Sequence, residues 1–310
     1  MPKRNPIPPG IVASSVTPFT RDGALNLRAV KPHIEWLIGE GVAGLSPLGS
    51  AGEFFAMESA DRKRVLDAVI EANAGRVPIM AGTHHYATRI AIDLSKHAER
   101  AGADALLIVP PYYGGPTRPA VMDHYRRIAD AVSIPTVLYH NAAGTGVDLD
   151  TAQLKQLFDE KAIAAIKLSN LMPDRMVELM QATRGRMPVY AGIDYVAFEG
   201  LSHGAHGWIS GIPSITPRAA NELYVAISRN GDLKTARLLW AKLAPLMRFL
   251  FESHTRGGVG VHWCGVMKAA LGMIGPDVGE PLPPSPPLNG AGRKRLAALL
   301  RDLGYRVRRS

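Results

Sequence analysis

The chain has 310 residues, 46% hydrophobic and 20% charged, a composition typical of a globular protein with a sizeable core. No apolar run approaches the roughly 18 residues that span a bilayer, and none follows the basic N-terminus, so we expect neither a membrane helix nor a signal peptide. The net charge of +9 collects near the ends without interleaved aromatic residues, which argues against nucleic-acid binding. The single cysteine, Cys264, excludes an internal disulfide and indicates a cytoplasmic protein with a buried helical thiol.

Short apolar runs alternate with helical patterns, which indicates parallel strands joined by crossover helices. The expected strands are Ile11–Thr17, Val42–Leu48, Val77–Gly82, Ala105–Val109, Thr136–His140, Ile163–Leu168, Val189–Gly192 and Gly207–Ser210. The expected helices are Leu27–Ile38, Ser59–Ala74, Ala87–Ala101, Ala120–Val132, Ala152–Phe158, Met172–Ala182, Tyr195–Leu201 and Pro217–Ser228. Eight such units predict an α/β fold, a (β/α)8 TIM barrel, over residues 1–229.

Residues 230–310 are expected to form a C-terminal helical domain with a basic tail. Helical periodicity covers Lys234–Glu252 and Val261–Ile274. A proline cluster, residues 281–287, predicts a stiff connector before a last helix, Gly292–Leu303.

In a barrel of this kind the active site lies at the C-terminal ends of the strands. Lys167 ends the sixth apolar run, and burial there disfavours the ammonium form of a lysine. A neutral lysine amine attacks carbonyl carbons and forms Schiff bases, which act as electron sinks. For a lone lysine, a side chain that reaches the surface from a strand end is the commoner case. The other strand ends change this balance, because tyrosines and a serine are expected at the same mouth.

Six sequence segments together resemble the dihydrodipicolinate synthase / N-acetylneuraminate lyase family of Schiff-base-forming barrels. The similar segments are Val-Thr-Pro-Phe (16–19), Gly-Ser-Ala-Gly-Glu (49–53), Pro-Tyr-Tyr (111–113), Leu-Tyr (138–139), Ile-Lys (166–167) and Gly-Ala-His-Gly-Trp-Ile-Ser (204–210). Each segment alone is a weak signal of the family. Together they cover nearly the whole chain, in the order and at the spacing of the family.

The resemblance implies a role for each matching residue. Lys167 forms an imine with the keto carbon of pyruvate or another 2-oxo acid, and Tyr139 beside it shuttles protons. The Ser50 hydroxyl bridges Tyr139 to Tyr113, which reaches across from a neighbouring subunit. The backbone N–H groups of Ser50 and Ala51, in a glycine-flanked turn, bind the substrate carboxylate. It also implies no cofactor, no metal, a small-molecule partner, and a homotetramer built as a dimer of dimers.

Further residues at the strand ends are candidates for substrate binding. Asp194 either caps the next helix or contacts a substrate hydroxyl. The histidines at positions 84, 85 and 140 are expected on the rim without metal-ligand spacing. The complete set of substrate-binding candidates is Ala51, Gly192, Asp194, Ile209, Ser210, His140 and Gly144.

The chain departs from the family pattern in the loop after Tyr139. Gly144 stands at the position where dihydrodipicolinate synthases carry an arginine, which pairs with a carboxylate of the substrate. Ala51 stands where both named enzymes commonly carry a hydroxyl residue, and Tyr195 stands where sialic acid lyases favour an acidic residue. Three interpretations therefore stay open: a carbon–carbon lyase or aldolase that releases or consumes pyruvate, a dehydratase or deaminase of a hydroxylated 2-oxo acid or hydroxy-pyrroline carboxylate through the same imine, and a non-catalytic binding barrel.

Overall fold

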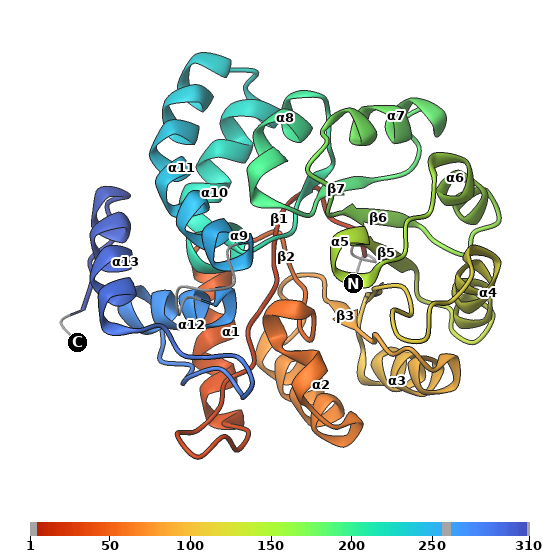
Figure 1. Cartoon of the computed structure of the whole chain (residues 1–310), viewed down its shortest axis with the longest axis horizontal. Helices are drawn as coiled ribbons and strands as arrows, with labels where there is room; N and C mark the ends of the chain where they lie inside the picture. The colour runs from red at the N-terminus through yellow and green to blue at the C-terminus, as the bar shows by residue number, and fades with distance from the viewer. Residues whose placement is uncertain (1–4, 256–261, 309–310) are drawn as a thin grey trace.

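Parallel strands surrounded by helices make up most of the molecule in this computed structural model, which describes residues 5–255 and 262–308 (Figure 1). The strands are β1 Gly10–Ala13, β2 Gly44–Leu45, β3 Met80–Gly82, β4 Ala105–Ile108, β5 Thr136–His140, β6 Ala165–Leu168, β7 Val189–Ala191 and β8 Gly207–Trp208. Within the described residues they form one eight-stranded sheet in the order β2-β1-β8-β7-β6-β5-β4-β3. A parallel bridge between Leu45 and Ile79 closes it into the predicted (β/α)8 barrel.

The alternation predicted from the sequence is confirmed, although the strands are shorter than the apolar runs. The α-helices are α1 Val30–Gly39, α2 Ser59–Asn73, α3 Thr88–Ala101, α4 Arg118–Ala129, α5 Ala142–Thr145, α6 Thr151–Asp159, α7 Asp174–Ala182, α8 Ala197–Ser202, α9 Ile212–Ile215, α10 Pro217–Tyr224, α11 Leu233–Thr255, α12 Trp263–Ile274 and α13 Gly290–Asp302. Short 3-10 turns are η1 Leu27–Ala29, η2 Ser50–Gly52, η3 Phe54–Ala56 and η4 Asp194–Val196, and η5 Val225–Arg229 is a π-helix.

Two short helices, α5 and α9, were not predicted. They follow β5 and β8 and so form part of the barrel mouth. Each is only four residues long and gives too little periodicity to be recognised. Their place matters, because the loops after the strands carry the active site in this fold.

Two groups of buried side chains separate the inside of the barrel from its outer wall. The inner group takes alternate residues of the strands, among them Val137 and Tyr139 of β5, Ala165 of β6 and Ile209 after β8. The larger outer group lies between strands and helices and continues into the C-terminal segment. Successive strand residues point to opposite faces, so Lys167, two residues after Ala165, points to the inside.

Helices α11 and α12 pack against the barrel at α10 and α9, and α13 packs on the outside of α11 and α12 (Figure 1). Buried residues of this segment, such as Leu246 and Leu271, belong to the same outer core as the barrel residues. Cys264 is buried in α12, as predicted. Val261, the first residue of one predicted helix, lies outside the described residues. In the described part of the chain, no helix is long and apolar enough to cross a membrane.

Candidate active site

Lys167 and Tyr139 face each other inside the barrel. They are partners in the parallel register of β5 and β6. The Lys167 Nζ atom lies 3.7 Å from the centre of the Tyr139 ring, and both residues are buried. A cation over an aromatic face is an attractive arrangement. The adjacent strands therefore place an amine and a phenol at one point of the barrel mouth.

The Tyr139 hydroxyl is surrounded by polar side chains. Burial raises the pKa of the Tyr139 phenol, but the charge of Lys167 and hydrogen bonds with Ser50, Ser169 and Lys167 outweigh it, so this pKa lies below its usual value of 10.0. The Asn141 Nδ2 atom lies 3.5 Å from the Tyr139 oxygen. Such surroundings favour transfer of a proton to and from the phenol.

Sequence patterns alone did not identify Ser169 and Asn141. Ser169 comes two residues after Lys167, and its hydroxyl donates to the Gly192 carbonyl oxygen at 2.9 Å. Asn141 comes two residues after Tyr139 and accepts the Gly144 N–H at 3.2 Å. Because side chains repeat every second residue along a strand, both positions continue the inner face. That spacing was the signal that could have identified them.

Ser50 lies in a tight turn between β2 and α2. The residues on either side of this turn, Leu48 and Glu53, are left-handed with φ of 61° and 54°. A Cβ at Gly52 would lie 3.2 Å from the Ser15 carbonyl oxygen, whereas a Cβ at Gly49 would meet no atom within 4 Å. Packing within the protein thus favours glycine at position 52 but not at position 49. The left-handed backbone conformation is adopted by Leu48 and Glu53 and not by either glycine.

Asp194 is buried near Lys167 but does not cap the helical turn that it begins. Burial raises the pKa of its carboxyl to about 6, although hydrogen bonds with Ile212, Ser210 and Trp208 and the charge of Lys167 oppose this. The Asp194 Oδ1 atom accepts from Trp208 Nε1 at 3.0 Å and from the Ile212 N–H at 3.1 Å. It therefore fixes the start of α9 at the mouth.

Among the other candidates, Ile209 lies fully buried inside the barrel. Gly192 has no room for a side chain, because a Cβ there would lie 2.4 Å from the Ser169 hydroxyl oxygen. Ile209 thus belongs to the inner group of side chains, and Gly192 packs against Ser169, two residues after Lys167.

His140 lies on the opposite face of β5 from Tyr139. Its Nε2 atom is 3.2 Å from the Asp148 carboxylate, which also pairs with Arg175 at 2.8 Å. Burial, together with the charge of Arg175, lowers the pKa of His140 to about 4, although Asp148 opposes the shift. The structure therefore does not bring His140 together with Lys167.

His84, expected on the rim, is fully buried instead. Its ring centre lies 4.5 Å from that of Phe54 and 6.3 Å from that of Tyr139. Its Nδ1 atom accepts the Val109 N–H at 2.8 Å, so the proton of the neutral ring is on Nε2. Burial, with the charges of Arg62 and Lys167, holds the pKa of His84 well below its usual range.

Tyr113 is 79% exposed, so it is not buried beside Tyr139. Its ring centre lies 6.1 Å from that of Tyr86, which contacts Tyr112 at the same distance. The three tyrosines form an exposed aromatic group. Within one chain, Ser50 and Tyr139 are together and Tyr113 is apart from them.

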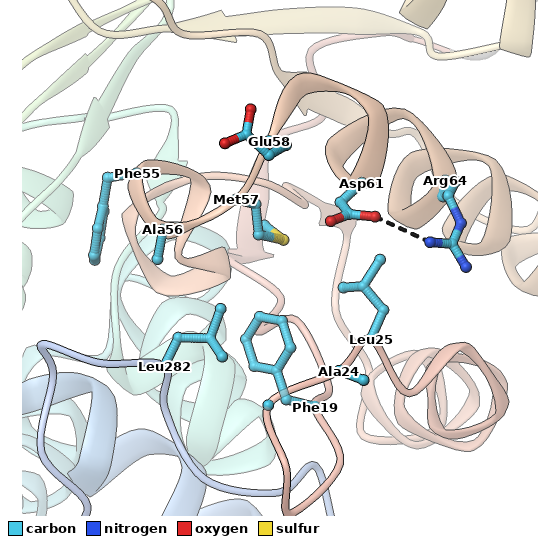
Figure 2. A pocket seen from close by; sticks show the side chains of 11 residues that line it. Phe19, Ala24, Leu25, Phe55, Ala56, Met57, Glu58, Asp61, Arg64 and Leu282 are labelled. Carbon is cyan, nitrogen blue, oxygen red and sulfur yellow. Dashed lines mark hydrogen bonds and ion pairs between the residues drawn. The ribbon is translucent and has the colours of Figure 1, made fainter.

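A cavity of about 560 Å³ lies between the turn of residues 55–57 and the side chains of Phe19 and Leu282 (Figure 2). Neither Lys167 nor Tyr139 lines it, so it is distinct from the candidate active site. No group of three or more His, Cys, Asp or Glu side chains within residues 5–255 and 262–308 is arranged to hold a metal ion.

The class of protein defined by the structure is a (β/α)8 barrel with a buried lysine–tyrosine pair at its mouth. Comparison with known proteins identifies the family. The model of the dihydrodipicolinate synthetase family matches residues 8–303. A 4-hydroxy-tetrahydrodipicolinate synthase of Anaeromyxobacter sp. (strain K) is 35% identical over 299 residues, covering 96% of this chain and 98% of the relative. The chain therefore belongs to the dihydrodipicolinate synthetase family, whose members are carbon–carbon lyases.

Two solved structures of relatives were determined with pyruvate. YagE, a prophage protein of this family from E. coli K12, has a TM-score of 0.88 and 31% identity, with 96% of this chain and 99% of YagE covered. A chloride-inhibited dihydrodipicolinate synthase from Acinetobacter baumannii has a TM-score of 0.85 and 33% identity, with the same coverage.

Proposed function

We propose that this protein is a Schiff-base lyase or aldolase that releases or consumes pyruvate, acting on a hydroxylated 2-oxo acid. The observation that carries the proposal is the 3.7 Å contact between the Lys167 amine and the Tyr139 ring, inside a barrel mouth. A binding pocket has no need of a buried amine next to a phenol whose pKa is lowered. The pair therefore argues against a non-catalytic binding barrel.

In the proposed reaction, the Lys167 amine attacks the keto carbon of the 2-oxo acid. The Tyr139 phenol gives a proton to the resulting hydroxyl, which leaves as water, and an imine forms. The protonated imine then accepts the electron pair of the bond that breaks at the neighbouring carbon. Tyr139 takes the proton from the hydroxyl of the departing aldehyde. The enamine left on Lys167 then takes a proton from Tyr139 at its terminal carbon and becomes the imine of pyruvate. Water adds to this imine carbon and gives a proton back to Tyr139, and the carbon–nitrogen bond breaks to release pyruvate and the free Lys167 amine.

The surrounding residues fit this sequence of proton transfers. Ser50 and Ser169 stabilise the phenolate form of Tyr139 by hydrogen bonds. The backbone N–H groups of Ser50 and Ala51 bind the carboxylate of the 2-oxo acid, in the open space beside Gly49. Binding of pyruvate by two relatives supports this assignment of the substrate class.

A dehydratase or deaminase that works through the same imine is the second candidate. The observation that favours it is the surroundings of Gly144, where a Cβ would lie 2.7 Å from Asn141 Nδ2. The neutral Asn141 amide occupies the space that a carboxylate-binding side chain would need. An amide pairs with hydroxyl and carbonyl groups. This site therefore suits a polyhydroxylated substrate better than a second carboxylate.

Sodium borohydride trapping, followed by peptide mass spectrometry, tests the proposal directly. Pyruvate is expected to leave a reduced adduct on Lys167, and Lys167→Ala is expected to fold, form no adduct and show no turnover. An adduct with hydroxylated 2-oxo acids but none with pyruvate favours the dehydratase or deaminase. If no 2-oxo acid leaves an adduct on Lys167, the proposed chemistry is contradicted.

A further inference from the structure

A buried ion pair joins the turn that carries Ser50 to the C-terminal helices. The Glu53 Oε1 atom lies 2.8 Å from the Lys268 Nζ atom, and the two side chains are 0% and 1% exposed. Well-packed apolar residues stabilise a core as well as or better than such a pair, because both charges lose their water. Stability alone therefore does not explain why charged residues occupy these two positions.

On the barrel side, the pair holds a residue in a rare backbone conformation. Glu53 has φ of 54° and ψ of 38°, the left-handed region that non-glycine residues adopt only where their surroundings hold them. Its N–H donates to the Ser50 carbonyl oxygen at 3.0 Å. Its second carboxylate oxygen, Oε2, accepts the Leu282 N–H at 2.8 Å. The carboxylate thus anchors the end of the Ser50 turn from outside the barrel.

On the C-terminal side, Lys268 of α12 makes further contacts. Its Nζ atom donates to the Glu280 carbonyl oxygen at 3.0 Å and lies 4.1 Å from the centre of the Phe19 ring. The Phe19 N–H donates to the Val278 carbonyl oxygen at 3.1 Å, and a Cβ at Gly279 would lie 2.0 Å from the Phe19 carbonyl oxygen. Residues 278–282 therefore fit closely against the barrel segment that contains Phe19.

Three other titratable side chains lie near the pair: the Glu280 carboxylate attracts Lys268 as Glu53 does, whereas His33 and Cys264 balance neither charge. Burial, with the charge of Lys268, lowers the pKa of His33 to about 3. Burial, with the charge of Glu53, raises the pKa of Cys264 far above its usual range. Both groups are uncharged at neutral pH, so neither provides a counter-charge for Glu53 or Lys268.

We propose that Lys268 is a positioning residue for catalysis: through its buried ion pair with Glu53 it holds the Ser50 turn in place against Tyr139. The inference rests on the proposed function, in which Ser50 serves the proton transfers of Tyr139. The same end of the turn is also held by a barrel residue, because the Thr17 hydroxyl donates to the Gly52 carbonyl oxygen at 2.7 Å. The C-terminal helices thereby become part of the catalytic unit.

The double variant Glu53→Gln/Lys268→Met tests this inference without leaving a buried charge unpaired. The introduced glutamine amide would still accept the Leu282 N–H, and the introduced methionine would fill the volume of the lysine, so the variant is expected to fold. Lys268→Met alone leaves Glu53 unpaired and is expected to unfold at lower temperature. Leu296→Ala is the matched control, because it destabilises α13 from a fully buried position without touching the turn.

Two measurements are compared across these variants. We expect the rate of imine formation at saturating pyruvate to fall by roughly 10- to 100-fold in the double variant, because displaced catalytic groups lose rate rather than simply affinity. Hydrogen exchange of the amides of residues 50–53 is expected to accelerate in the same variant. Leu296→Ala is expected to change neither quantity, although its melting temperature falls.

Unchanged amide exchange, or an imine rate equal to that of the unmodified protein, in the folded double variant would overturn the positioning role. Equal loss in Leu296→Ala would also overturn it, because the effect would then follow from general destabilisation. If the unmodified protein forms no adduct with any 2-oxo acid, the proposed function fails. In that case faster amide exchange still supports the tie between Lys268 and the turn, but its catalytic meaning is lost.

Discussion

The Lys167 Nζ atom lies 3.7 Å from the centre of the Tyr139 ring because their strands pair in register. One residue of slippage between β5 and β6 would turn one of the two side chains toward the outer wall. The register of buried parallel strands is set by their apolar faces, here Val137 and Ala165. The chemistry at the mouth thus depends on how the barrel interior packs.

Tyr139→Phe tests Tyr139 as the proton shuttle of imine formation and of the later steps. The ring and its contact with Lys167 remain, but the hydroxyl is lost. We expect the adduct with pyruvate still to form, but both its formation and the later proton transfers to slow by roughly 10²- to 10⁴-fold. Tyr125→Phe is the matched control, because Tyr125 is buried in α4 among the outer group of side chains and its hydroxyl donates to the Ile108 carbonyl oxygen. Full turnover in Tyr139→Phe would remove it as the proton shuttle.

Gly144→Arg tests whether the Gly144 loop excludes substrates with a second carboxylate. The new Cβ would lie 2.7 Å from Asn141 Nδ2, so the Asn141 side chain must rotate away from Tyr139. The new guanidinium would then pair with a carboxylate at the mouth, an interaction of about 1.5–3 kcal/mol. We expect KM for an aldehyde that carries a carboxylate to fall about tenfold or more.

Gly144→Ala provides the comparison for that experiment. It introduces the same Cβ without the charge, so it moves Asn141 but cannot bind a carboxylate. A similar decrease of KM in both variants would show that displacement of Asn141, rather than charge, changes the substrate preference. No decrease in Gly144→Arg would place the carboxylate-binding position elsewhere.

Much of the fold follows from local sequence patterns. Apolar runs and helical periodicity predict the barrel, because each strand is buried on both faces and each helix on one. The short helices α5 and α9 cannot be recognised in this way, since four residues give no period. Their positions depend on contacts such as that of Asp194 with the Ile212 N–H, which join residues far apart in the sequence.

The candidate site divides in the same way. Lys167 and Tyr139 can be predicted because strand ends converge at one mouth. The buried state of His84 and the partner of Glu53 could not, because both depend on which distant segment covers them. Lys268 lies more than 200 residues from Glu53, and nothing in the local sequence of either residue indicates an ion pair.

Asp194 predicts a pH dependence of stability. Its pKa is about 6 in the folded protein, above the value of 3.8 for an aspartate in the unfolded chain. The favourable contribution of its protonated form is fully present below pH 3.8 and is lost as pH rises through 6. At higher pH the folded state bears a cost of about 3 kcal/mol. Asp194→Asn keeps an oxygen acceptor and is expected to gain stability relative to the unmodified protein between about pH 4 and about pH 8.

Urea unfolding at both pH values measures this difference, and Asp232→Asn is the control. A hydrogen bond with the Thr235 side chain and others with the backbone lower the pKa of Asp232, so its linkage has the opposite sign. The favourable contribution of the charged Asp232 is present above pH 3.8 and lost only below it, so Asp232→Asn is expected to show nearly the same stability difference from the unmodified protein at both pH values. The same pH response in both variants would contradict the assignment to Asp194.

Tyr113 is expected to serve the active site of a neighbouring subunit, which explains its 79% exposure within one chain. Mixing of two inactive variants, Tyr113→Ala and Lys167→Ala, tests this directly. In a mixed dimer, the subunit with intact Lys167 receives Tyr113 from its partner. Random mixing in equal amounts then restores about a quarter of normal turnover, because half of the dimers are mixed and each has one complete site. If the mixture stays inactive after exchange of subunits, or if a monomer with Tyr113 intact turns over at the full rate, Tyr113 does not act across an interface.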